Sequence, residues 1–136
     1  MDGFIAQTGK SAVAKAAIRL CAWLALLIII VLSVVPGSMR PSVVASDYYE
    51  HFTAYFIAGG LLATGYSRLK QMLLSAIMLS LCGGTLEIIQ LWIVDRTASA
   101  GEFAASACGA WTAFFFAYVV KGADIGTKTA RDPLPK

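Results

Sequence analysis

The run IRLCAWLALLIIIVLSVV, residues 18–35, decides the fold class of this chain. It is rich in Leu, Ile and Val, and it is followed by a loop bracketed by Pro36 and Pro41. A helix of roughly 20 apolar residues crosses a bilayer core about 30 Å thick. A basic flank precedes the run, as in a signal peptide, but the run is too long for one and lacks a small-residue cleavage site. The segment is therefore predicted to be a transmembrane helix.

Three further segments are long and apolar enough to be predicted as spans: residues 51–66, 72–94 and 102–120. The chain has 136 residues, of which 58% are hydrophobic and 14% charged. This composition indicates a single membrane domain rather than a water-soluble one. The predicted fold class is an all-α bundle of four transmembrane helices over residues 18–120. Residues 1–17 are predicted to form an N-terminal arm, and the polar residues 121–136 a disordered tail.

The basic residues predict the orientation of these spans. With four helices, one side of the membrane receives Lys10, Lys15, Arg19, Arg68, Lys70, Lys121, Lys128, Arg131 and Lys136. The other side receives only Arg40 and Arg96. Because Lys and Arg concentrate in cytoplasmic loops, both termini are predicted to be cytoplasmic. Since the basic residues lie between apolar segments, the net charge of +3 does not indicate nucleic-acid binding.

Polar side chains are predicted to converge near the outer ends of three of these helices. Asp47, Glu50 and His51 lie where the second span starts, and Glu87 and Gln90 lie near the end of the third. Arg96 follows in the outer loop, and Glu102 and Ser106 open the fourth span. His51 shares a helix face with Tyr55, and Glu102 shares one with Ser106. These faces are predicted to surround a cleft that opens on the outer leaflet.

Several of these residues also have a purely structural interpretation. Asp47 with Glu50, and Ser99 with Glu102, fit capping boxes that start a helix. For Glu102 the sequence leaves a cap and a site residue equally open. Glu87 has no such role, because it lies inside a span where an ionised group is costly. It is predicted either to be functional, with Gln90 as its hydrogen-bonding neighbour, or to form a structural ion pair with Arg96 or His51.

The segments DYYEHFTAY (47–55), EIIQLW (87–92) and DRTAS (95–99) resemble the VanZ-like family of small bacterial membrane proteins. The family pattern is matched by Asp47, His51, Phe52, Tyr55, Glu87, Gln90, Arg96 and Gly109. Three positions depart from it: Tyr48 where Lys is usual, Glu102 where Asp is usual, and Ser106 where Asn is usual. The resemblance implies a multi-pass protein of the bacterial inner membrane in a cell-envelope setting related to glycopeptide resistance. It does not define a biochemical activity.

The predicted site offers acid–base groups and a clamp for an anion. His51 and Glu87 are the hypothetical acid and base, and Arg96 is suited to hold a phosphate or carboxylate. The other predicted ligand-binding residues are Asp47, Tyr55, Gln90, Glu102 and Ser106. With one histidine in the chain, no metal site is predicted, and no cofactor motif is found. The three cysteines lie in apolar stretches and indicate no disulfide framework.

Three hypotheses follow from the sequence. The first is a VanZ-like protein whose outer cleft binds, or binds and modifies, a lipid-linked or anionic envelope ligand. The second is a non-catalytic membrane scaffold, and the third is a proton-coupled transporter of small solutes. The third is disfavoured because the inner halves of the spans lack ionisable residues to complete a path. Membrane lipids are the expected partners, and glycine-lined helix faces also permit self-association.

Overall fold

The computed structural model describes the backbone of residues 2–39 and 46–131, and the side chains of residues 11–39 and 46–122. Four α-helices form the molecule: α1 (Asp2–Val34), α2 (Asp47–Gly65), α3 (Leu69–Gln90) and α4 (Ala100–Arg131). A short 3₁₀-helix, η1 (Gly37–Met39), follows α1. The described residues contain no β-strand, so the all-α prediction is confirmed.

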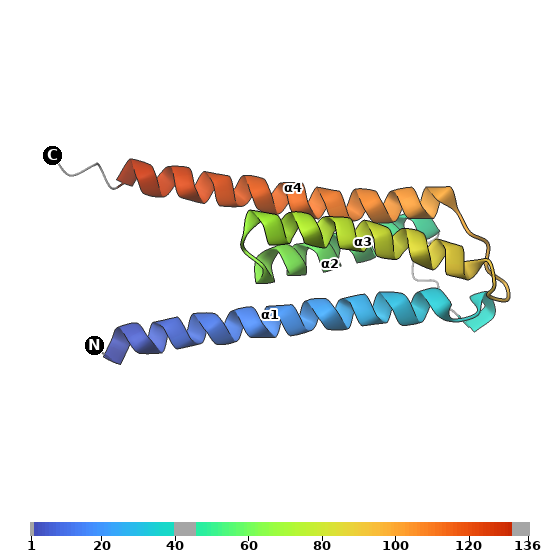
Figure 1. Cartoon of the computed structure of the whole chain (residues 1–136), viewed down its shortest axis with the longest axis horizontal. Helices are drawn as coiled ribbons and strands as arrows, with labels where there is room; N and C mark the ends of the chain where they lie inside the picture. The colour runs from blue at the N-terminus through green and yellow to red at the C-terminus, as the bar shows by residue number, and fades with distance from the viewer. Residues whose placement is uncertain (1, 40–45, 132–136) are drawn as a thin grey trace.

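The four helices alternate in direction, so both ends of the chain lie at the same end of the bundle (Figure 1). The connection between α2 and α3 also lies at this end, and the loops after α1 and α3 lie at the opposite end. The central element is α2, which contacts all three other helices and packs most extensively against α4. The start of α2, the end of α3 and the start of α4, which carry the predicted site residues, therefore lie at the same end of the bundle.

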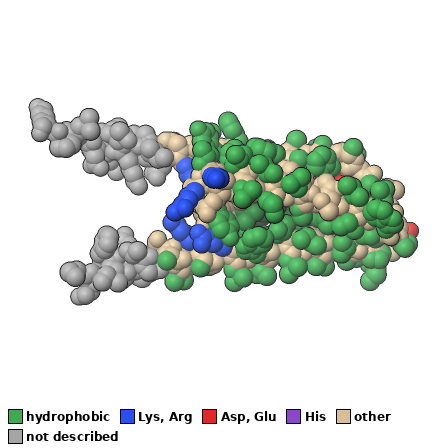
Figure 2. All heavy atoms as spheres, in the orientation of Figure 1, with side chains coloured by type: hydrophobic (Ala, Val, Ile, Leu, Met, Phe, Trp, Pro, Cys, Tyr) green, Lys and Arg blue, Asp and Glu red, His purple; other side chains and the backbone are tan. Residues whose placement is uncertain are grey.

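Among the described residues, three segments are long and apolar enough to cross a membrane: Ser11–Val34, Leu69–Gln90 and Ala100–Gly122. Only 11% of the most apolar window of the first is buried, so its apolar side chains face outward. Figure 2 shows hydrophobic side chains over most of the visible surface between the two ends of the bundle. An apolar exterior of this extent suits lipid rather than water. The helix α2 is not among these segments, so the predicted span at residues 51–66 is not confirmed.

Two helices extend well beyond their predicted limits, and two differ by a few residues. α1 begins at Asp2, and α4 continues to Arg131. The structure thus has helix over residues 121–131, where the sequence predicted a disordered tail, and residues 132–136 lie outside the described part. α3 ends at Gln90 rather than at residue 94, because the next amides bond three residues back, as in Trp92 N–H to Ile89 O at 3.1 Å. Such 3₁₀-type bonds tighten and end a helix.

The close packing of α2 on α4 depends on small residues at their interface. A Cβ placed on Gly109 would collide with the carbonyl oxygen of Phe52 and would lie 3.0 Å from the backbone nitrogen of Phe56. At Gly59, a Cβ would lie 3.0 Å from the Cβ of Ala113. Helices in lipid gain little from the hydrophobic effect and associate through this kind of backbone approach. The glycine pattern therefore positions the two helices that carry His51 and Glu102.

Two basic side chains fasten the other end of the bundle around the carboxyl end of α2. Arg19 donates from Nε to Gly65 O at 2.9 Å, and its guanidinium lies 4.7 Å from the centre of the Tyr66 ring. Lys121 donates from Nζ to Ala63 O at 2.7 Å. The last carbonyls of a helix lack intrahelical partners and carry partial negative charge, so cations are favourable there. These contacts tie α1 and α4 to α2.

Candidate functional site

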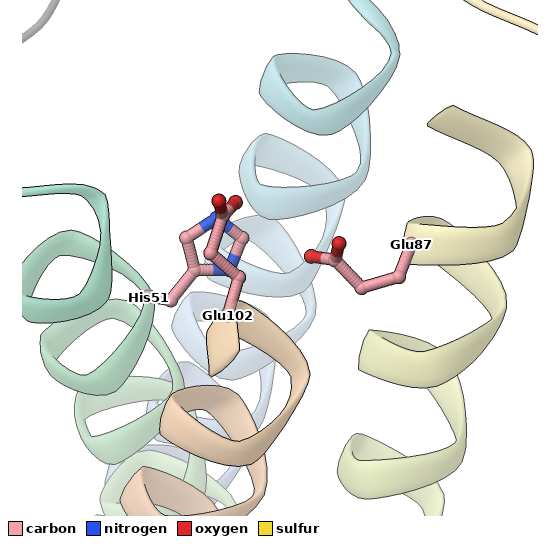
Figure 3. A group of neighbouring side chains, drawn as sticks. All are labelled: His51, Glu87 and Glu102. Atoms are coloured by element: carbon pink, nitrogen blue, oxygen red, sulfur yellow. The ribbon is translucent and has the colours of Figure 1, made fainter. Parts of the chain in front are cut away.

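The ionisable side chains His51, Glu87 and Glu102 meet at the end of the bundle where α2 and α4 begin and α3 ends (Figure 3). One potential ligand atom from each lies within 4.8 Å of the others. Glu87 points its carboxylate from α3 toward the other two side chains, which come from α2 and α4. His51 and Glu87 are buried, and Glu102 is half-buried. The tertiary structure thus joins three groups that are far apart in the sequence.

Both nitrogens of the His51 ring have a partner on α4. Nε2 lies 3.0 Å from Oε2 of Glu102, and Nδ1 lies 3.1 Å from Oγ of Ser106. A ring held at both nitrogens has a fixed orientation. The serine is almost fully buried, and it lies against Gly83 of α3, where a Cβ would come within 3.2 Å of its own Cβ. The same glycine faces the hydroxyl of Tyr55, at 3.3 Å from the Cβ position. Ser106 therefore helps to fix the orientation of the His51 ring.

The carboxylate of Glu87 serves the amino end of α4. Its Oε2 accepts the backbone N–H of Ser99 at 2.8 Å. Ser99 in turn accepts the backbone N–H of Glu102 on its own Oγ at 3.3 Å, which makes it the N-cap of α4. A carboxylate at this place is stabilised by unpaired amides and by the positive end of the helix dipole. Of the predicted Ser99–Glu102 capping box, the hydrogen bond from the Glu102 N–H to the Ser99 hydroxyl is present. The other bond, from the Ser99 N–H, goes to Glu87 of α3 instead of Glu102.

Glu102 is consequently directed at His51. In a complete capping box its carboxylate would accept the Ser99 N–H, but that N–H is given to Glu87. The capping box is thus not completed by Glu102, and the role of Glu102 as a site residue stays a prediction. The predicted Asp47–Glu50 capping box is wrong, because α2 begins at Asp47 and its N-cap is Ser46, which forms no side-chain cap bond. Asp47 and Glu50 instead lie in the first turn, where acidic groups favour helix formation.

Two other predicted site residues bind α1. Gln90 donates from Nε2 to Ser33 O at 3.1 Å, and the expectation that it is hydrogen-bonded to Glu87 is wrong. Its Oε1 is buried without a hydrogen-bond partner among the described residues. Arg96 donates from Nη2 to Leu32 O at 2.8 Å and from Nε to Val35 O at 3.4 Å. Arg96 thus caps the carboxyl end of α1, and its role as an anion clamp stays a prediction.

A groove between α3 and α4 reaches the cluster from the apolar side of the bundle. It encloses about 530 Å³. Glu87 and Ser99 lie in its wall together with large apolar side chains, including Leu91 and Phe103. The groove could not be predicted from the sequence, because its walls come from two separate segments, α3 and the start of α4. No protein-family model, curated protein or solved structure matches this chain.

Proposed function

We propose that this protein crosses the membrane four times, with both termini in the cytoplasm, and that it is a VanZ-like protein of the bacterial inner membrane. Figure 2 shows Lys and Arg side chains gathered at the end of the bundle where the chain ends also lie. Arg19 and Lys121 both contact the carboxyl end of α2 at this end. By the positive-inside rule this end faces the cytoplasm. The cluster of His51, Glu87 and Glu102 then lies at the outer leaflet.

The direction of the helices supports α2 as the fourth span. α1 and α3 run in the same direction, so the chain must return across the bilayer between them. With 19 residues, α2 is about 28 Å long, close to the thickness of the hydrocarbon core. Its buried face includes Ala58, Gly59 and Ala63, which pack against protein rather than lipid. A helix surrounded by three others needs less apolar surface, which accounts for its modest hydropathy.

The cluster and groove together bind a lipid-linked ligand of the cell envelope. One observation carries this proposal: Glu87 lies both in the wall of an apolar groove and within 4.8 Å of two other potential ligand atoms. A lipid has the matching chemistry, because its chain suits the groove and its polar head suits the ionisable groups at the outer end. An anionic head would also attract Arg96, which is fixed at this end of the bundle by its bonds to α1.

The same groups equip the protein to modify such a ligand. His51 and Glu87 can exchange protons with a hydroxyl group or a water molecule placed between them. Glu102 and Ser106 hold the imidazole at its two nitrogens, so His51 passes a proton to or from the ligand through the Glu102 carboxylate at its Nε2. Acid–base chemistry requires this kind of orientation before it requires any particular pKa.

A scaffold is the second candidate, and a specific observation favours it. The His51–Glu102 contact joins α2 to α4, and the bond from Ser99 to Glu87 joins α4 to α3. These contacts lock the three helices together without any ligand. Under this alternative, the polar groups stabilise the fold and bind no specific lipid.

Native mass spectrometry of detergent-extracted protein separates the two candidates. The wild type is compared with His51→Ala and Glu87→Gln for lipids that remain bound. Thr64→Ala is the control, because this exposed hydroxyl near the opposite end of α2 bonds only to Gly60 O within its own helix. Far-UV circular dichroism of each variant verifies that the helices are retained.

The proposal expects the wild type and the control to carry one phospholipid or polyprenyl phosphate species that both site variants lose while remaining folded. If all four proteins carry the same bulk lipids, the ligand proposal is refuted and the scaffold is supported. Site variants that lose helical structure as well as lipid also support the scaffold.

A further inference from the structure

We propose that His51, Glu87 and Glu102 form a binding site for one divalent transition-metal ion, with Zn²⁺ the best match. Imidazole nitrogen and carboxylate oxygen are both ordinary zinc ligands, and sites with three protein ligands are typical where the ion keeps an open position. Each of the three side chains comes from a different helix. The site therefore exists only in the folded bundle, and the presence of a single histidine in the sequence does not exclude it.

The separations between the ligand atoms agree with coordination of one ion. Ligands at about 2.1 Å from a metal lie about 3.0 Å apart at octahedral right angles and about 3.4 Å apart in a tetrahedron. Nε2 of His51 and Oε2 of Glu102 are 3.0 Å apart, and the ligand atoms of all three residues lie within 4.8 Å of one another. The upper limit of 4.8 Å exceeds these values, so the Glu87 carboxylate must move toward the other two ligands when an ion binds.

Contacts outside the cluster hold the ligands as metal sites require. A zinc-bound histidine usually has its other ring nitrogen fixed by a polar neighbour, and Nδ1 of His51 lies 3.1 Å from Ser106 Oγ. With Nε2 on the metal, Nδ1–H donates to that hydroxyl, and a water molecule bound to the ion would take over the acid–base role proposed for His51 and Glu87. Glu87 is fixed in the same way, because its Oε2 accepts the Ser99 N–H at 2.8 Å. The first contact orients His51 before an ion arrives, and the second holds the Glu87 carboxylate close to the site.

Electrostatics favour a cation at this place. Two carboxylates beside one imidazole form an acidic site at low exposure, with side-chain exposures of 10% for His51 and 13% for Glu102. Carboxylates that share a poorly hydrated site repel each other, and a divalent ion removes this repulsion. The ion would also supply positive charge next to the groove, where a water molecule or a phosphate oxygen can take the open position.

The test is metal binding by the detergent-purified full chain, with no lipid ligand added. Protein stripped with a chelator is titrated with Zn²⁺ against a competing fluorescent indicator, and bound metal is counted by inductively coupled plasma mass spectrometry. We expect one Zn²⁺ per chain. Because free thiols also bind zinc, the exposed Cys21 and Cys108 are replaced together by Ser in a control that is expected to retain the site.

Isosteric variants identify the ligands. Glu102→Gln keeps the size of the side chain but removes the charge, and it should weaken Zn²⁺ binding at least about 100-fold. Glu102→Asp keeps the carboxylate and should retain stoichiometric binding, and Ser106→Ala should weaken it about 10-fold. Stoichiometric binding that is equal in the wild type and in folded Glu102→Gln would overturn the inference, as would a folded wild type that binds no Zn²⁺. The inference needs no lipid, so loss of the lipid proposal leaves this result unaffected.

Discussion

Replacement of Gly109 by Ala should separate α2 from α4 and destabilise the bundle. The new Cβ would collide with the Phe52 carbonyl oxygen and lie 3.0 Å from the Phe56 backbone nitrogen. A carbon and an oxygen that are not bonded to each other normally stay about 3.3 Å or more apart. Since both obstacles are backbone atoms of a helix, no side-chain rotation relieves them. The helices must move apart, which costs about 3 kcal/mol, the upper part of the usual range for overpacking.

The chain offers a matched control in Gly60→Ala. A Cβ at Gly60 meets nothing within 4 Å. Both substitutions replace glycine by alanine inside a helix, so the gain in helix propensity of about 1 kcal/mol is common to the two variants. Their difference in unfolding free energy isolates the packing term. We expect Gly60→Ala to be at least as stable as the wild type, and Gly109→Ala to be about 3 kcal/mol less stable than Gly60→Ala.

The assay is reversible unfolding in mixed micelles, in which the fraction of a denaturing detergent is raised and helicity is followed by far-UV circular dichroism. A difference of about 3 kcal/mol corresponds to more than 100-fold in the unfolding equilibrium constant. Equal stability of the two variants would refute the close packing of α2 on α4. It would also remove the physical basis for the 3.0 Å contact of His51 with Glu102, because that contact bridges the same two helices.

Substitutions at three further positions test other contacts with the same unfolding assay. Glu87→Ala removes the acceptor of the Ser99 N–H and should lower the unfolding free energy by about 1.5–3 kcal/mol, as expected for a hydrogen bond to a charged group. Glu87→Gln keeps an oxygen and should lower it less. Equal losses of stability in the two variants would contradict the capping role. Lys121→Met keeps the length of the side chain but loses the hydrogen bond to Ala63 O, so the unfolding free energy should fall by about 1–2 kcal/mol. An unchanged unfolding free energy would show that this contact does not hold α4 to α2. Asp95 has a φ of 58°, in the left-handed region. Asp95→Ala should therefore lower the unfolding free energy by about 1 kcal/mol, whereas Asp95→Gly should not. Identical effects of the two substitutions would exclude a left-handed backbone at this residue.

Much of the architecture could be predicted because the membrane restricts the choices. Lipid offers no hydrogen-bonding partners, so a long apolar run must be helical. The run at 18–35 lies in the apolar segment of α1 up to Val34, and the pattern of apolar segments predicts all four helices. The helix ends were harder to predict, because they depend on polar contacts. The end of α3 at Gln90 reflects 3₁₀-type bonds that no hydropathy pattern encodes.

The candidate site could be predicted only in part. The spacing of polar residues identified His51, Glu87, Glu102 and Ser106 as groups near one end of the bundle, and the structure brings these four together. It uses Gln90 differently, because the amide reaches a carbonyl of α1 rather than Glu87. Sequence spacing describes neighbours on one helix, but it carries no information about which helix faces which.

The sequence by itself determined that this protein is suited to a membrane, that it is helical, and at which end of the bundle its ionisable groups gather. These properties follow from the composition and period of single segments. Only the tertiary structure decided the partners: Ser99 gives its N–H to Glu87, and Glu102 is thereby left to face His51. The physical reason is distance. Whether the Glu102 carboxylate caps α4 or reaches His51 depends on a few ångströms. The close approach of α2 and α4 at Gly59 and Gly109 brings the two side chains within reach of each other.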